Sequence, residues 1–158
     1  FSNKKIQVII YEFIESRQIS EVDIINNPEI LLEIYKIILN INKHGFIHRD
    51  IRKENILITN QGVRLIDFSF IVPFNKDDET FIRVFSSYKN SRILKYLGDG
   101  YNPGNYEWND FYSMTKLINK IIINNTIAVS TLKEIQKYKK MFENSIRNNT
   151  YRLISCEE

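Results

Sequence analysis

The strongest constraint in the sequence is a run of eight mostly polar residues, His48 to Asn55, placed between apolar segments. Two short apolar runs follow it, Ile56 to Thr59 and Val63 to Ile66, and the sequence Asn60-Gln61-Gly62 joins them. A turn containing Asn and Gly between two runs of strand-forming residues is typical of a β-hairpin. The pattern predicts a polar loop that leads into a small hairpin, with Asp67 directly after it.

A long helix is expected before the polar loop. Asn27 suits an N-cap and Pro28 suits the first helical position, and isoleucines recur at helical spacing from Ile30 to Ile41. Gly45 suits the end of this helix, because glycine adopts the positive φ that a helix stop often requires. The segment from Asn27 to Gly45 therefore predicts an amphipathic helix that ends shortly before the polar loop.

Two further helices are expected after the hairpin, at Trp108 to Ile123 and at Ser130 to about Asn144. Asn109 or Asp110 would lie near the N-cap of the first. The interval from Val72 to about Tyr106 lacks sustained periodicity, and a loop of that length in a compact domain is usually functional or mobile. Helices together with a small hairpin predict an α+β fold.

The first part of the chain predicts a strand, a connector and a short helix. Ile6 to Tyr11 is an apolar run rich in Ile and Val, as in a buried strand. Glu12 to Ile19 is expected to be a connector. Ser20 with Asp23 three residues later resembles a capping box, which predicts a short helix that ends near Asn26.

Composition narrows the class of protein. The chain has 158 residues, 43% of them hydrophobic and 26% charged, which predicts one globular domain over residues 1–158 and excludes disorder. A net charge of +3 is too small to indicate a nucleic-acid partner. No apolar stretch reaches the roughly 20 residues of a membrane span. The single cysteine, Cys156, excludes an internal disulfide and fits a reducing, cytoplasmic location.

The polar loop resembles a known catalytic motif. His48-Arg49-Asp50 with Asn55, followed after the hairpin by Asp67-Phe68-Ser69, is similar to the protein-kinase catalytic loop H-R-D-x-x-x-x-N and the D-F-G metal motif. The resemblance implies a kinase-like α+β domain, with a last N-lobe strand and hinge in residues 1–19 and a helical C-terminal lobe in residues 20–158. It also implies that the glycine-rich loop and the phosphate-binding lysine of an N-terminal lobe are missing from the chain.

The resemblance implies transfer of the γ-phosphate of ATP to a hydroxyl group. Magnesium ions neutralise phosphate charge and take oxygen ligands, so Asp67 and Asn55 are the expected metal ligands. Asp50 stands where a base accepts or orients the proton of the acceptor hydroxyl. Arg52 stands where many kinases place a lysine that contacts the transferring group. Asp50, Arg52 and Asn55 are therefore the catalytic candidates.

The nucleotide would bind beside the hinge. Val8 to Ile14 looks like the fifth kinase strand running into the hinge, where backbone groups of Glu12 and Ile14 would bond adenine. Leu57 would form the floor of the adenine pocket. Asp67 completes this expected set of nucleotide-binding residues through its metal ion.

Three other residues have supporting roles by the same resemblance, and a fourth departs from the motif. Asp110 would hold the backbone of the catalytic loop, or would serve only as a helix cap. His48 would support the catalytic and metal loops, and Arg49 would pair with a phosphorylated or acidic segment. Ser69 replaces the glycine of D-F-G, and a positive φ there would be costly for serine.

The acceptor is open at the level of sequence. A protein serine/threonine kinase-like enzyme is the first expectation, with ATP and a hydroxyl-bearing protein as partners. A bacterial lipopolysaccharide or sugar kinase with a glycan acceptor is an alternative, because no A-P-E motif is found and few helices follow Ile123. A pseudokinase or lobe fragment that acts as a binding module is a second alternative, because the phosphate-binding lysine is missing.

Overall fold

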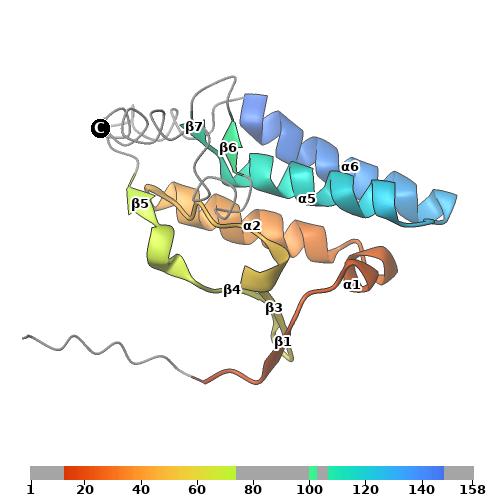
Figure 1. Ribbon diagram of the computed structural model, residues 1–158, viewed down its shortest axis with the longest axis horizontal. Coiled ribbons are helices and arrows are strands. Elements are labelled where there is room, and N and C mark those ends of the chain that lie inside the picture. Colours follow the sequence, from red (N-terminus) through yellow and green to blue (C-terminus); the bar gives the residue numbers. More distant parts are fainter. Residues whose placement is uncertain (1–12, 74–99, 103–106, 148–158) are drawn as a thin grey trace, which may run out of the picture.

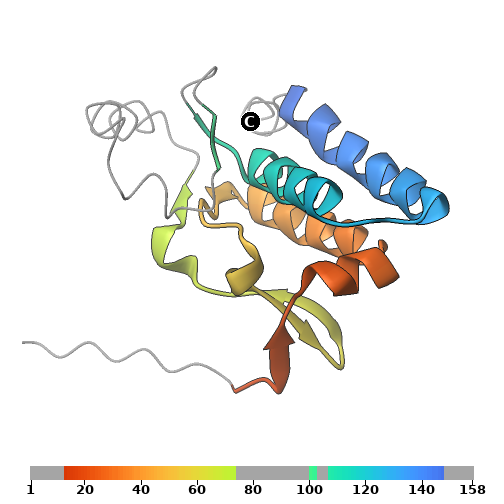
Figure 2. The ribbon, with the colours of Figure 1, turned by 45° about the vertical axis from the view of Figure 1, so that its right-hand side comes forward.

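A computed structural model describes residues 13–73, 100–102 and 107–147 of the chain. The strand expected at 6–11, the hinge residue Glu12, Cys156 and most of the long loop lie outside the described residues. Figure 1 and Figure 2 show a layer of helices above a small antiparallel sheet. The described part is thus a mixed helical and β structure, as the sequence predicts.

The helical layer consists of long helices stacked in rows. Helix α2 (Ile30–Lys43) lies below α5 (Asp110–Asn124) in Figure 1, and α6 (Val129–Arg147) lies above α5. The short helix α1 (Glu21–Asn26) packs near one end of α2. None of the helices in the described ranges combines the length and the apolarity that a membrane crossing requires.

The main sheet has the strand order β1-β3-β4 and is antiparallel throughout. Strands β3 (Ile56–Thr59) and β4 (Gly62–Leu65) form the predicted hairpin, and β1 (Ser16–Gln18) pairs with the free edge of β3.

Two shorter pairs lie along the rest of the described chain. Strand β2 (Phe46–Ile47) pairs with β5 (Val72–Pro73), and β6 (Tyr101–Asn102) pairs with β7 (Glu107–Trp108). Single turns of 3-10 helix occur at Lys53–Asn55 and Phe68–Phe70. The pairing of β2 with β5 brings the start of the polar loop close to the chain that follows Asp67.

The core lies between the helices and one face of the hairpin. Ile34 and Ile38 of α2 are buried, as are Ile56 of β3 and Ile118 of α5. An aromatic cluster joins the three long helices. The rings of Tyr35 of α2, Phe111 of α5 and Phe142 of α6 contact one another, with centroids 5.3 to 6.1 Å apart. The hydroxyl groups of Tyr35 and Ser145 hydrogen bond at 2.9 Å and tie α2 to α6. 

Helix α2 begins later than the sequence predicts. Asn27 and Pro28 form a tight turn, in which the amide of Ile30 donates to the Asn27 carbonyl at 3.2 Å and that of Leu31 to the Pro28 carbonyl at 3.0 Å. These bonds span three residues instead of four, so the N-cap is Glu29 and its side chain makes no capping bond. The predicted end is confirmed, since Gly45 has a φ of +78°.

The connector predicted from Glu12 to Ile19 is wrong in its second half. Ser16, Arg17 and Gln18 form β1, with Ser16 opposite Thr59 and Gln18 opposite Leu57. All three β1 side chains are exposed, so they show no apolar alternation, and the strand is held by backbone pairing. The predicted capping box is confirmed, because Ser20 and Asp23 each bond the other's backbone amide.

We expect Phe142→Ala to lower the free energy of unfolding by about 3 to 5 kcal/mol, because it empties a fully buried aromatic site. Val129→Ala on the same helix, at a residue that is 70% exposed, should change it by less than about 0.5 kcal/mol. Urea denaturation of both variants measures the difference. Equal effects would contradict the core described above.

Candidate active site

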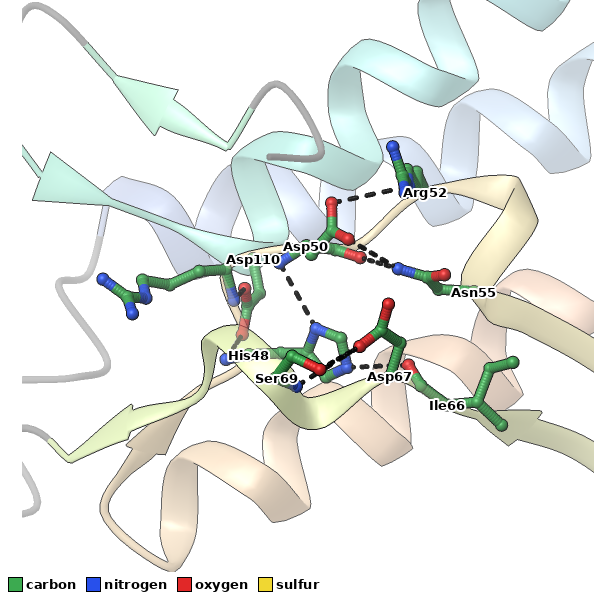
Figure 3. A network of polar contacts seen from close by, with 9 residues as sticks. His48, Asp50, Arg52, Asn55, Ile66, Asp67, Ser69 and Asp110 are labelled. Atoms are coloured by element: carbon green, nitrogen blue, oxygen red, sulfur yellow. Dashed lines mark hydrogen bonds and ion pairs between the residues drawn. The ribbon is translucent and has the colours of Figure 1, made fainter. Parts of the chain in front are cut away.

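The end of the polar loop is hydrogen bonded to the residue that follows the hairpin. The loop runs from the end of β2 to the 3-10 turn at Lys53–Asn55, and the amide of Ile66 donates to the carbonyl of Asn55 at 3.0 Å. Asp67 follows Ile66 directly, so this backbone bond holds Asp67 beside the end of the loop. Figure 3 shows the Asp67 carboxylate below the pair of Asp50 and Asn55, with one oxygen directed towards Asn55.

Asp110 anchors the beginning of the loop. It is the first residue of α5 and is fully buried. Its Oδ2 accepts the backbone amide of His48 at 2.8 Å, and its Oδ1 accepts that of Arg49 at 2.9 Å. Asn109 is the helix cap, since its Oδ1 accepts the amide of Tyr112 at 3.0 Å. Burial raises the pKa of Asp110 to about 6, and the two amide bonds oppose that rise.

His48 connects the catalytic loop to the residue before Asp67. Its Nδ1 accepts the amide of Asp50 at 3.3 Å, so Nε2 carries the proton and donates to the Ile66 carbonyl at 3.1 Å. Burial lowers the pKa of His48 below its ordinary value, because the charged form is poorly solvated. The ring of Phe68 packs edge-on against the imidazole, with centroids 4.8 Å apart. The neutral ring thus bridges the two loops, as the resemblance implies.

Asp50 is buried and oriented by two neighbours. Its Oδ2 accepts Nδ2 of Asn55 at 2.8 Å, and the same nitrogen donates to the Asp50 carbonyl at 2.9 Å. Its Oδ1 lies 3.5 Å from Nε of Arg52. Within the described residues this buried Oδ1 accepts no hydrogen bond. The structure therefore brings the three catalytic candidates together and leaves one oxygen of Asp50 able to accept a proton.

Asp67 has a left-handed backbone and a carboxylate held by Ser69. Its φ is 62°, and its Oδ1 accepts the Ser69 hydroxyl at 2.6 Å and the Ser69 amide at 3.3 Å. The serine hydroxyl is the main reason that the pKa of Asp67 lies below its ordinary value. The cost expected for a positive φ at Ser69 does not arise, because the positive φ falls on Asp67 and Ser69 lies in the 3-10 turn.

The side chain of Arg49 makes a second link between the polar loop and the chain after Asp67, besides the His48 bond to Ile66. Arg49 has a φ of 70°, its side chain is buried, and its Nε donates to the carbonyl of Phe70. The phosphorylated or acidic segment that Arg49 is expected to pair with would follow in residues 74–99, which lie outside the described residues.

The expected nucleotide-binding residues are less closely grouped. Leu57 is half-buried on β3, where strand alternation places it on the face opposite the core residues Ile56 and Ile58. Its partner across the sheet is Gln18 of β1, a residue that the sequence analysis did not consider. Ile14 precedes β1 and is 41% exposed. Among these residues, only Leu57 and Gln18 are paired by the described structure.

The oxygen donors near the loop suit a magnesium ion. Asn55 donates both of its bonds to Asp50 from Nδ2, so the side-chain oxygen Oδ1 of Asn55 is not used in them. Only Oδ1 of Asp67 bonds Ser69. Magnesium commonly takes one or two protein oxygens and completes its shell with phosphates and water. The described residues contain no group of three or more His, Cys, Asp or Glu that could hold a metal by itself.

Comparison with known proteins supports a kinase-like assignment. The RIO domain family matches residues 3–84, just over half of the chain. The chain belongs to the RIO domain family. This RIO domain protein is therefore kinase-like, and its matched region includes the polar loop, the hairpin and Asp67.

Two curated relatives of the RIO domain protein are serine/threonine-protein kinases. It is 30% identical over 102 residues to serine/threonine-protein kinase CBK1 of Saccharomyces cerevisiae, and 45% identical over 56 residues to CBK1 of Candida albicans. These matches cover 63% and 35% of this chain, but only 13% and 7% of the relatives. No solved structure matches the chain significantly.

We expect the buried carboxylate of Asp110 to give stability an inverse dependence on pH. Its folded-state pKa of about 6 exceeds the unfolded value of 3.8, so the folded chain binds more protons between these values. Its contribution to the free energy of unfolding should therefore fall as pH rises from about 4 to about 6, by roughly 3 kcal/mol at 1.4 kcal/mol per pKa unit. Urea denaturation across this range, with Asp110→Asn subtracted, isolates the effect. Parallel profiles for the two proteins would contradict it.

Proposed function

We propose that this RIO domain protein transfers the γ-phosphate of Mg-ATP to a hydroxyl group, as a serine/threonine kinase-like enzyme. The observation that supports the proposal most is the environment of Asp50. One of its oxygens is fixed by Asn55, while the other is buried beside Arg52 and accepts no hydrogen bond within the described residues. A carboxylate held in this way suits a group that takes a proton from an incoming hydroxyl.

In the proposed reaction, the oxygen of the acceptor hydroxyl attacks the γ-phosphorus while Asp50 accepts the hydroxyl proton. The bond between the γ-phosphorus and the β–γ bridging oxygen breaks, so that ADP leaves. Arg52 steadies the carboxylate and offers its guanidinium to the transferring phosphoryl group. Asn55 keeps Asp50 in place through Nδ2. The side-chain Oδ1 of Asn55 and a carboxylate oxygen of Asp67 would hold the magnesium ion. Bound magnesium would neutralise phosphate charge and orient the leaving group.

The nucleotide would lie on the face of the hairpin that carries Leu57. This face is opposite the core, so adenine could pack there without displacing buried side chains. Backbone groups of Ile14 and Glu12 remain the proposed adenine partners. Gln18, opposite Leu57 in the sheet, is a polar neighbour for the same ligand.

A protein hydroxyl is the preferred acceptor in this proposal. The support is the similarity to two serine/threonine-protein kinases. We place the reaction in the cytoplasm, where ATP and magnesium are available. A glycan hydroxyl would require the same chemistry from Asp50, so acceptor assays distinguish the two classes.

Mg-ATP should stabilise the chain, because a ligand that binds the folded state adds RT ln(1 + [L]/Kd) to the free energy of unfolding. At a hundred times Kd the gain is about 2.7 kcal/mol, which corresponds to a rise in Tm of roughly 5 to 10 °C. Asp67→Asn should remove most of the shift. Glu54→Gln, an exposed carboxylate in the same loop, should keep it. Absence of a shift in the unaltered chain would contradict nucleotide binding.

Asp50→Asn should separate binding from transfer. We expect the Tm shift with Mg-ATP to persist, while phosphate transfer from radiolabelled ATP falls by about 10²- to 10⁴-fold, the usual contribution of a general base. Casein and a lipopolysaccharide preparation test the two acceptor classes in parallel. Nucleotide binding without transfer to either acceptor or to water would favour a binding module instead of an enzyme.

A further inference from the structure

The carboxylate of Asp67 is held asymmetrically. Its Oδ1 accepts two hydrogen bonds from one residue, from the Ser69 hydroxyl at 2.6 Å and from the Ser69 amide at 3.3 Å. Neither bond involves Oδ2. In Figure 3, one Asp67 oxygen faces Ser69 and the other points towards Asn55. The two oxygens of the same carboxylate therefore have different surroundings.

The backbone makes this asymmetry a fixed feature. Asp67 is the N-cap of the 3-10 turn Phe68–Phe70, with a left-handed φ of 62°. A carboxylate that caps a turn must present one oxygen to the amide two residues later. Ser69 adds its hydroxyl to the same oxygen, and a bond from a hydroxyl to a carboxylate at this distance is a strong one. Rotation of the carboxylate would break both bonds.

The number of available carboxylate oxygens matters for the choice of cation. Calcium takes six to eight oxygen ligands and accepts bidentate carboxylates, whereas magnesium requires a compact octahedral shell with single oxygens. A carboxylate that offers only Oδ2 suits the magnesium shell. A carboxylate that is free to offer both oxygens also suits calcium.

We propose that Ser69 is a specificity-determining residue, which restricts Asp67 to one oxygen and so favours magnesium over calcium. The inference rests on the proposed function, because it takes Asp67 as a ligand of the nucleotide's metal ion. It assigns to Ser69 a positioning role that acts through the carboxylate of Asp67.

The test measures cation affinity and requires no catalysis. MgCl₂ and CaCl₂ are titrated separately into the full chain in the presence of saturating ADP, and NMR follows the side-chain amide of Asn55 and the backbone amide of residue 69. Ser69→Ala removes the hydroxyl at an exposed position, and Ser69→Thr retains it. Ser130→Ala is the matched control, because Ser130 is an exposed serine at the start of α6.

We expect the ratio of calcium affinity to magnesium affinity to rise about tenfold in Ser69→Ala, the scale of one lost hydrogen bond to a charged group. Ser69→Thr and Ser130→Ala should keep the ratio of the unaltered chain. An unchanged ratio in Ser69→Ala would overturn the inference, as would an equal loss of affinity for both cations, which a purely structural role predicts. If the unaltered chain binds neither cation, the magnesium site of the proposed function fails as well.

Discussion

The arrangement of the site depends on a carboxylate that has no contact with solvent. Asp110 is fully buried and uses both oxygens to hold consecutive backbone amides, those of His48 and Arg49. A buried carboxylate is costly unless it is hydrogen bonded, and an unpaired backbone amide is costly too. Each therefore compensates the other. Because Asp110 begins α5, the helical layer sets the position of the polar loop.

From Asp110, a series of hydrogen bonds extends through His48 to the residues that carry the acidic side chains, Asp50 and Asp67. His48 receives the amide of Asp50 on one ring nitrogen and bonds the carbonyl before Asp67 with the other. Both the raised pKa of Asp110 and the lowered pKa of His48 follow from burial, which disfavours charge of either sign. The imidazole thus acts as a neutral spacer between the loop that carries Asp50 and the loop that carries Asp67.

The sequence predicts the elements that have a recognisable pattern of apolar or turn-forming residues. Helix α2 is evident because its isoleucines repeat along one face. The hairpin is evident because Asn60-Gln61-Gly62 between two apolar runs is typical of a hairpin turn. Strand β1 could not be predicted, since its three side chains are all exposed and show no apolar alternation. Backbone pairing with β3 forms the strand, and the pairing of Arg17 with Asp23 gives no strand signal in the sequence. The late start of α2 was equally hidden, because Asn27 and Pro28 suit a tight turn as well as a helix.

At the site, the motif indicated which residues meet, but not how they are held. Either Asn109 or Asp110 could have capped α5, and only the fold shows that Asn109 does so while Asp110 turns to the loop. The contact of Ser69 with Asp67 had a local signal, since an aspartate side chain often accepts the backbone amide two residues later. Comparison with the glycine of D-F-G directed attention to the backbone of Ser69 instead.

The pairing of β2 with β5 has a consequence for ligand affinity. This pairing closes one end of the polar loop, and the bond from Ile66 to Asn55 closes the other. The loop therefore loses its conformational freedom when the chain folds. A ligand that meets an already ordered loop does not have to compensate for ordering it. Its binding free energy is then not reduced by loop entropy, and weakening either closure would lower affinity without altering a residue that touches the ligand.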